Sequence, residues 1–355
     1  MPTIDADTHV IETERTWEYM EGGEAKFRPA LVSMESGREF WFIDGKIFSR
    51  GGNVNPDIPS GVREMRDIQA RLRHMDELQI DVQVLYPSLF LRPLTARAEV
   101  EAALCRSYNR WVSELCLETQ GRLRWVAAVP LLSMDAALAE VRLAKNRGAC
   151  ALFMRGIMSD KILSDPYFYP LYDEAQKLNL AICIHASTGG FQWVELFERE
   201  SGFAKFKLAV VSAFHALVHD GIPDKFPKLR FGFIEVRAQW LPYVYHELAK
   251  RFEKSGKPLG KGWMRESRLY VACQTDDDLP YVLKYSGEDN IVIGSDYGHA
   301  DTSSEIEALR NLKKKGELKP DVIDKILYEN PKALYDIFGG SLPGEARGSS
   351  HRPRC

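Results

Sequence analysis

Residues 180–187 read LAICIHAS, an apolar run that ends in a histidine followed by small residues. Short apolar runs with β-branched residues are typical of strands buried on both faces of a parallel sheet. Amphipathic stretches that favour helices, such as residues 134–147 and 167–177, lie between runs of this kind. Eight such runs occur, at residues 3–10, 81–87, 123–131, 150–156, 180–187, 230–236, 269–275 and 290–296. Eight strands alternating with helices predict an α/β protein built as a (β/α)8 TIM barrel.

Two segments do not fit a minimal barrel. Residues 20–60 contain REFWFIDGKIFSR, in which Asp-Gly joins two apolar runs. This pattern predicts a β-hairpin inserted after the first strand, where it would form a flap over the barrel mouth. Residues 341–355 are small, polar and basic, and they predict a disordered tail after a single barrel domain of residues 1–340.

The overall composition favours a small-molecule substrate. The 355 residues carry a formal net charge of −3, which gives no reason to expect a nucleic acid or a membrane surface as partner. The six cysteines show no CxxC spacing and are expected to be reduced thiols, mostly in the core. The first residues lack the features of a signal peptide, and no apolar run is long enough to span a membrane, so we expect a cytoplasmic protein.

Polar residues with metal-ligand chemistry stand at the carboxyl ends of three of the predicted strands. Asp7 and His9 are two residues apart on the first strand, so both side chains point to one face. His185 ends the fifth strand and Asp296 ends the eighth. Because active sites of such barrels lie at this end, the four residues predict a metal site. The alternative is that they are buried structural histidines and capping aspartates.

Several stretches together resemble a known family. They are DADTHVIE, DVQVLYPS, YNRWVSEL, GRLRWVAAVPLLSMDAALAEV, SDPYFYPLYDEAQKLNLAICIHAS, FPKLRFGFIEV with WLP shortly after it, and IGSDYGH. In combination they resemble the amidohydrolase superfamily, in the branch typified by aminocarboxymuconate semialdehyde decarboxylase and resorcylate decarboxylases. The resemblance implies that Asp7, His9, His185 and Asp296 hold a divalent metal ion. It also implies a homodimer.

One position departs from the decarboxylases of that branch. They usually carry a histidine at the end of the sixth strand, where it serves as acid or base, and the matching residue here is Glu235. A buried carboxylate needs a partner, and a metal ion is the expected one. The alternative is an ion pair of Glu235 with Arg155 or Arg237.

The chain contains more candidate ligands than one ion needs. His299 follows Asp296 by three residues, and Glu12 follows Asp7 by five, so a second metal ion is plausible. Alternatively His299 caps a loop or donates a proton, and Glu12 is a solvated or helix-starting residue. Further candidates for contacting the substrate or supporting the ligands are Arg155, Arg237, Trp193 and His215, the last of which we expect, with His219, mainly to pack within a helix.

These features favour a nonheme diiron monooxygenase that hydroxylates a small organic acid or a CoA-linked substrate. The reasons are Glu235, the surplus of ligands without a thiolate, and a resemblance to diiron monooxygenases within the branch. The alternative is a zinc- or manganese-dependent hydrolase or nonoxidative decarboxylase. A noncatalytic metal-stabilised protein is the least favoured of the three.

Overall fold

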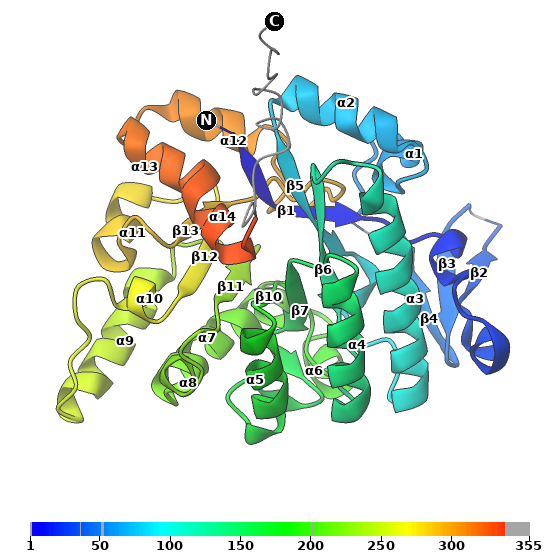
Figure 1. The fold of residues 1–355 in the computed structure, drawn as a ribbon, viewed down its shortest axis with the longest axis horizontal. Helices are drawn as coiled ribbons and strands as arrows, with labels where there is room; N and C mark the ends of the chain where they lie inside the picture. Colours follow the sequence, from blue (N-terminus) through cyan, green and yellow to red (C-terminus); the bar gives the residue numbers. More distant parts are fainter. Residues whose placement is uncertain (1, 36, 51–52, 201, 338–355) are drawn as a thin grey trace, which may run out of the picture.

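The protein is described from a computed structural model that covers residues 2–35, 37–50, 53–200 and 202–337. Eight parallel strands form one sheet in the order β1-β5-β6-β7-β10-β11-β12-β13, with helices around it (Figure 1). The strands are β1 (Ile4–Val10), β5 (Val82–Pro87), β6 (Leu123–Ala128), β7 (Ala151–Arg155), β10 (Ala181–His185), β11 (Phe231–Ile234), β12 (Leu269–Cys273) and β13 (Ile291–Ile293). The (β/α)8 barrel and all eight predicted strands are confirmed.

The first and last strands meet at the carboxyl end of the barrel. Thr8 and Tyr297 form a parallel bridge, and the His9 amide donates to the Tyr297 carbonyl at 2.7 Å. The Asp296 amide donates to the Asp7 carbonyl at 2.9 Å. These contacts bring the loop after β13 against the end of β1, so candidate ligands 290 residues apart in the chain become neighbours.

Helices surround the sheet, and several begin at the residues that the sequence indicates. Asp67 caps α2 by accepting a hydrogen bond from the Ala70 amide at 2.8 Å, and Ser133 caps α4. The longer helices are α2 (Ile68–Leu78), α3 (Ala98–Leu117), α4 (Met134–Asn146), α5 (Tyr169–Lys177), α7 (Ala209–His219), α9 (Leu241–Lys254), α11 (Leu279–Ser286) and α12 (Ala308–Lys315). The short ones are α1 (Ser60–Arg63), α6 (Phe191–Leu196), α8 (Ile222–Lys225), α10 (Trp263–Glu266), α13 (Pro320–Asp324) and α14 (Asn330–Tyr335).

Several helical segments have tighter or wider turns than an α-helix, and β8 (Ile157–Met158) and β9 (Lys161–Ile162) form a separate two-stranded sheet. The predicted helix at residues 167–177 is divided into a 3-10 turn and α5, because Asp165 and Pro166 start the chain in the tighter turn. The 3-10 turns are η1 (Glu14–Trp17), η2 (Gly22–Phe27), η3 (Leu89–Leu91) and η4 (Pro166–Phe168), and the π-helical segments are η5 (Phe203–Leu208) and η6 (Lys325–Glu329). Within the described part of the chain, no helix is long and apolar enough to cross a membrane.

The insertion after β1 contains the predicted hairpin and one strand more. β3 (Glu39–Ile43) and β4 (Lys46–Ser49) pair antiparallel through Asp44 and Gly45, both at positive φ as a two-residue hairpin turn requires. β2 (Ala30–Ser33) adds the third strand. Trp41 is buried and packs edge-on against Trp17 with ring centroids 6.0 Å apart. The insertion is thereby fixed to the barrel, and its closing as a flap stays a prediction.

Two further expectations concern the cysteines and the tail. Cys105, Cys116, Cys150, Cys183 and Cys273 are free thiols, and all but the half-buried Cys116 are buried, as expected. The predicted tail at residues 341–355 lies outside the described residues.

Candidate metal centre

Strand β1 delivers two candidate ligands to the barrel interior. Asp5, Asp7 and His9 are spaced by two and all are buried, and the pairing of β1 with β5 shifts register between Asp5 and Thr8. Asp5 lies in the deepest layer, where it accepts hydrogen bonds from the Ser295 amide at 2.9 Å and from its hydroxyl at 2.5 Å. Asp7 and His9 lie nearer the mouth. A side chain at Gly294 would place its Cβ 2.2 Å from the Asp7 Cβ, so glycine is needed there.

Neighbouring strands β10 and β11 supply the next two residues. His185 Nε2 lies 3.1 Å from Asp7 Oδ1, and His185 Nδ1 lies 3.4 Å from Glu235 Oε2. Glu235 directly follows β11 and has a φ of 62°, in the left-handed region. Non-glycine residues adopt that conformation at a cost of about 1–2 kcal/mol, and such costs concentrate at functional sites. The backbone conformation that turns the chain at Glu235 is therefore a feature of this site.

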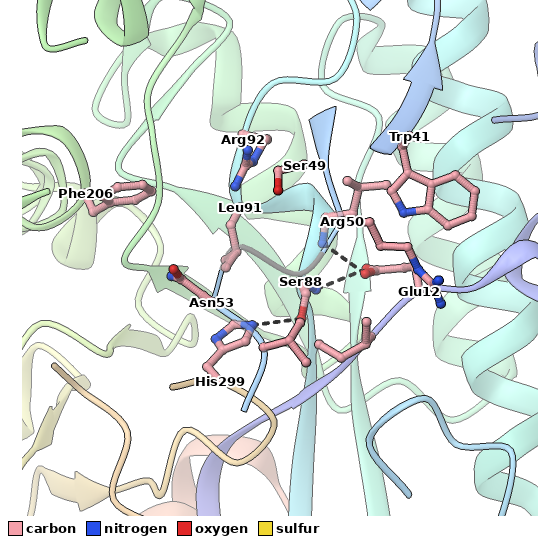
Figure 2. A pocket seen from close by; sticks show the side chains of 13 residues that line it. Glu12, Trp41, Ser49, Arg50, Asn53, Ser88, Leu91, Arg92, Phe206 and His299 are labelled. Carbon is pink, nitrogen blue, oxygen red and sulfur yellow. Dashed lines mark hydrogen bonds between the residues drawn. The ribbon is translucent and has the colours of Figure 1, made fainter. Parts of the chain in front are cut away.

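The loop after β13 contributes the last two residues. Asp296, with a φ of 51°, lies with its Oδ1 3.4 Å from His9 Nε2 and 3.0 Å from His299 Nδ1. The rings of His299 and His9 stack with centroids 3.8 Å apart. His299 Nε2 lies 2.9 Å from the Ser88 hydroxyl, which fixes the other side of the ring (Figure 2). Six side chains from four strand ends thus converge on one point.

These six residues, called the ligand cluster below, form two overlapping groups. Asp7, His9, His185 and Glu235 offer ligand atoms that lie within 4.8 Å of one another. His9, Glu235, Asp296 and His299 do so as well. Each group has the number and type of ligands that a divalent ion takes in proteins, and the two groups share His9 and Glu235.

Unpartnered atoms in the cluster show that a metal ion fits these residues. Both ring nitrogens of His9 are buried and have no hydrogen-bond partner in the described part of the chain, and Asp296 Oδ1 and His299 Nδ1 have none there apart from their 3.0 Å contact with each other. A buried polar group left in this state costs about 1–3 kcal/mol. A divalent cation would satisfy these atoms together, and the mixture of imidazole and carboxylate without thiolate suits zinc, manganese or iron.

The electrostatics of the cluster also favour a cation. Burial raises the pKa of Glu235 well above its usual value, and the neighbouring carboxylates of Asp296, Asp301 and Asp7 raise it further. Burial, together with His299 and His185, holds the pKa of His9 well below its usual value, so this imidazole is neutral. A neutral imidazole is the form that binds metal, and a bound cation would let the crowded carboxylates ionise.

Glu12 lies beside the cluster but outside both ligand groups. It is buried, and its two carboxylate oxygens accept hydrogen bonds from the Ser88 and Leu89 amides, each at 3.0 Å (Figure 2). Burial raises the pKa of Glu12 to about 7 despite these bonds. Glu12 is neither solvated nor the start of a helix. It is a carboxyl group that can gain or lose a proton near neutral pH.

The remaining candidates lie away from the ligand cluster. Arg155 donates to the carbonyls of Phe90 and Arg92 at 3.3 and 3.5 Å. Arg237 pairs with Asp276 at 2.5 Å, and neither arginine pairs with Glu235 among the described residues.

The histidine and tryptophan candidates belong to outer helices. His215 stacks on His219 within α7, with ring centroids 5.7 Å apart, which agrees with the predicted helix packing. Trp193 on α6 donates to the Lys205 carbonyl at 3.2 Å. Neither residue lines any of the three cavities that adjoin the ligand cluster.

The two larger of these cavities contain residues that were not predicted from the sequence. The small cavity, about 150 Å³, is lined by Glu12, Trp41, Ser49, Ser88, Arg92 and His299 among others (Figure 2). The large cavity, about 500 Å³, is lined by Ala186, Phe203, Lys207, Glu235, Asp301 and Ser303 among others. Asn53, Leu91 and Phe206 line both. Each cavity therefore reaches one residue of the ligand cluster, His299 in the small one and Glu235 in the large one.

Comparison with known families agrees with this barrel. The sequence profile of a family described as amidohydrolase matches residues 4–254. The chain belongs to this family. The match covers the first six barrel strands, and hence the amidohydrolase segment includes Asp7, His9, His185 and Glu235.

Three solved structures that share the fold are distant in sequence. An amidohydrolase from Mycobacterium avium subsp. paratuberculosis K-10 is 20% identical, with 94% of this chain and 99% of that chain covered and a TM-score of 0.77. A 5-carboxyvanillate decarboxylase from Sphingomonas paucimobilis is 17% identical, with 95% and 99% covered and a TM-score of 0.69. A dihydroxybenzoic acid decarboxylase from Polaromonas sp. JS666, with bound manganese, is 17% identical, with 96% and 98% covered and a TM-score of 0.69. At these identities the likeness establishes the fold.

Proposed function

We propose that this chain is a metal-dependent enzyme that removes the carboxylate of a small organic acid without an oxidant. The observation that carries the proposal is the ligand cluster at the barrel mouth, which adjoins a cavity containing the protonatable carboxyl group of Glu12. The decarboxylases among the structural relatives, one of them with bound manganese, support this reaction class. They favour it over the monooxygenase that the sequence analysis preferred.

Residues of this chain can supply what decarboxylation requires. A divalent ion held by the ligand cluster would polarise a substrate oxygen and stabilise the negative charge that develops as carbon dioxide leaves. The carbon atom that loses carbon dioxide must then receive a proton. Glu12, whose pKa is raised to about 7 by burial, can donate that proton. The Ser88 and Leu89 amides would stabilise the carboxylate that remains. Metal-dependent hydrolysis would use the same groups.

A dinuclear iron monooxygenase is the second candidate, because one specific observation favours it. Two ligand groups share His9 and Glu235, and such sharing suits two ions placed side by side. Glu235 belongs to both groups, and by the family resemblance it is the position at which decarboxylases of the branch usually carry histidine. The sequence analysis preferred this candidate, with two iron ions and an organic acid or CoA-linked substrate.

Turnover assays with and without dioxygen distinguish the two candidates. The metal-free protein is loaded with manganese, zinc or iron(II) and incubated with a panel of hydroxybenzoates and aliphatic acids under nitrogen and under air. We expect release of carbon dioxide from one of the acids under nitrogen, strongly reduced in Glu12→Gln and retained in Glu101→Gln, which changes a half-buried carboxylate outside the site. Product formation only with iron(II), dioxygen and a reductant would exclude the nonoxidative decarboxylase and support the dinuclear iron monooxygenase.

A further inference from the structure

The small cavity contains one cationic side chain without a partner, that of Arg92. Its guanidinium group forms no hydrogen bond or ion pair within the described residues. Burial lowers the pKa of Arg92 from its ordinary value, and no carboxylate offsets this effect. Arg92 is half-buried, and the desolvation of a guanidinium group is usually balanced by an anionic partner.

The other charged groups of this cavity are already balanced. Arg50 pairs with Glu39 and, at 3.1 Å, with Glu64. Glu12 is held by two backbone amides. The cavity therefore has an unmatched positive charge on the side of Arg92.

Neighbouring groups hold Arg92 in place and extend its hydrogen-bonding capacity. Arg155, from the end of β7, donates to the Arg92 carbonyl at 3.5 Å and to the Phe90 carbonyl at 3.3 Å, which ties down the segment after β5. Ser49, at the end of β4, lines the same cavity. Figure 2 shows Arg92 and Ser49 on the side of the cavity away from His299. A guanidinium group and a hydroxyl are suitable donors for a carboxylate.

The surroundings of Arg92 offer space for an apolar group as well. Leu91 and Phe206 form the boundary between the small and the large cavity, and Phe203 and Ala186 continue the apolar surface of the large one. A molecule anchored at Arg92 can thus extend along apolar side chains toward the ligand cluster.

We propose that Arg92 and Ser49 bind the carboxylate of an organic acid whose apolar part lies along Leu91 and Phe206. The carboxylate bound by Arg92 and Ser49 lies away from the metal centre. A substrate that loses one carboxylate at the metal centre therefore carries a second anionic group, which Arg92 binds. The inference rests on the proposed function for its identification of the ligand as substrate, but the binding of an anion by Arg92 needs no metal ion. The inserted strands acquire a specific role, because β4 contributes Ser49.

Binding of a simple aromatic acid tests this inference separately from catalysis. Benzoate and its neutral analogue benzamide are titrated calorimetrically into metal-free and manganese-loaded protein. The variants are Arg92→Met, Arg92→Lys and, as a matched control, Arg97→Met, since Arg97 pairs with Asp44 and Glu99 and does not line the small cavity.

We expect Arg92→Met to weaken benzoate binding about tenfold to a hundredfold, the usual effect of losing a charge-assisted hydrogen bond. Arg92→Lys should lie in between, benzamide binding should not change, and Arg97→Met should behave like the wild type. The same pattern in metal-free protein would support the anion site even if the proposed reaction fails. Equal benzoate affinity of Arg92→Met and wild type, or an equal loss for benzamide, would overturn it.

Discussion

Replacing Glu235 by glutamine should change the stability of the protein in opposite directions without and with metal. In the metal-free protein the ligand oxygen of Glu235 lies within 4.8 Å of one from Asp7 and of one from Asp296. Two ionised carboxylates at such a separation repel by roughly 3 kcal/mol at an effective dielectric constant of about 20. Because the folded-state pKa of Glu235 lies well above the usual value of 4.5, its ionisation costs stability as the pH rises above 4.5.

Glutamine removes this cost, so the metal-free variant should be more stable than wild type at pH 8. We expect a gain of about 2–4 kcal/mol, limited because the wild-type carboxyl keeps its proton rather than bear the full repulsion. The gain should vanish below pH 4.5, where Glu235 is protonated in folded and unfolded protein alike.

With metal bound, the same substitution removes an anionic ligand. Even groups that only support a ligand change metal affinity by about tenfold to a hundredfold, so a direct ligand should matter at least as much. A hundredfold loss of affinity removes about 2.7 kcal/mol of metal-dependent stabilisation.

Urea denaturation at pH 8, with a chelator and with excess manganese, measures both effects on wild type, Glu235→Gln and Glu101→Gln. Glu101 is a matched control, because it is largely buried with a pKa raised to about 7 by that burial and belongs to neither ligand group. The substitution Glu101→Gln should raise the free energy of unfolding equally in the metal-free and the metal-bound protein. A change of the same sign and size for Glu235→Gln in both forms would refute the assignment of Glu235 as a ligand.

Three further predictions concern groups around the site. Glu101→Gln should have the same free energy of unfolding as wild type below pH 4.5 and a free energy higher by up to about 3 kcal/mol at pH 8, because burial raises the pKa of Glu101 from 4.5 to about 7. Equal urea midpoints of the two proteins at both pH values would contradict this. Gly294→Ala should lower the melting temperature and abolish metal binding, since the new Cβ would lie 2.2 Å from the Asp7 Cβ. Gly61→Ala is the control, because a Cβ there meets nothing within 4 Å. Normal metal content in Gly294→Ala would be inconsistent with this packing. Trp41→Ala should cost about 3–5 kcal/mol of unfolding free energy because Trp41 is buried against Trp17. The folded variant should keep its metal, and loss of the metal would show that the insertion helps to hold the ion.

The barrel could be predicted because short apolar runs alternate with amphipathic stretches along the chain. Residues 180–187 are apolar up to His185, and each of the eight predicted runs contains a strand of the sheet. Since parallel strands place their carboxyl ends together, the proximity of Asp7, His185 and Asp296 followed without any knowledge of the loops.

The cavity residues could not be predicted in this way. Arg92 and Ser49 come from a turn after β5 and from the end of β4, and only the tertiary packing of the insertion against the barrel brings them together. The strand β2 was also missed, because its four residues are mostly exposed and show no alternation of buried and exposed positions. Trp193 and His215 were proposed from residue type, which carries no information about the direction in which a side chain points.

The central claim is that the ligand cluster is a metal centre, and elemental analysis tests it most directly. Wild type, Asp7→Asn, His185→Ala and Glu101→Gln are loaded anaerobically with manganese, zinc or iron(II), desalted and analysed for metal per chain. We expect one to two ions in wild type and in Glu101→Gln, and a marked loss in the two cluster variants. Wild-type protein that retains no more metal than Asp7→Asn and His185→Ala, while all four remain folded, would contradict the claim.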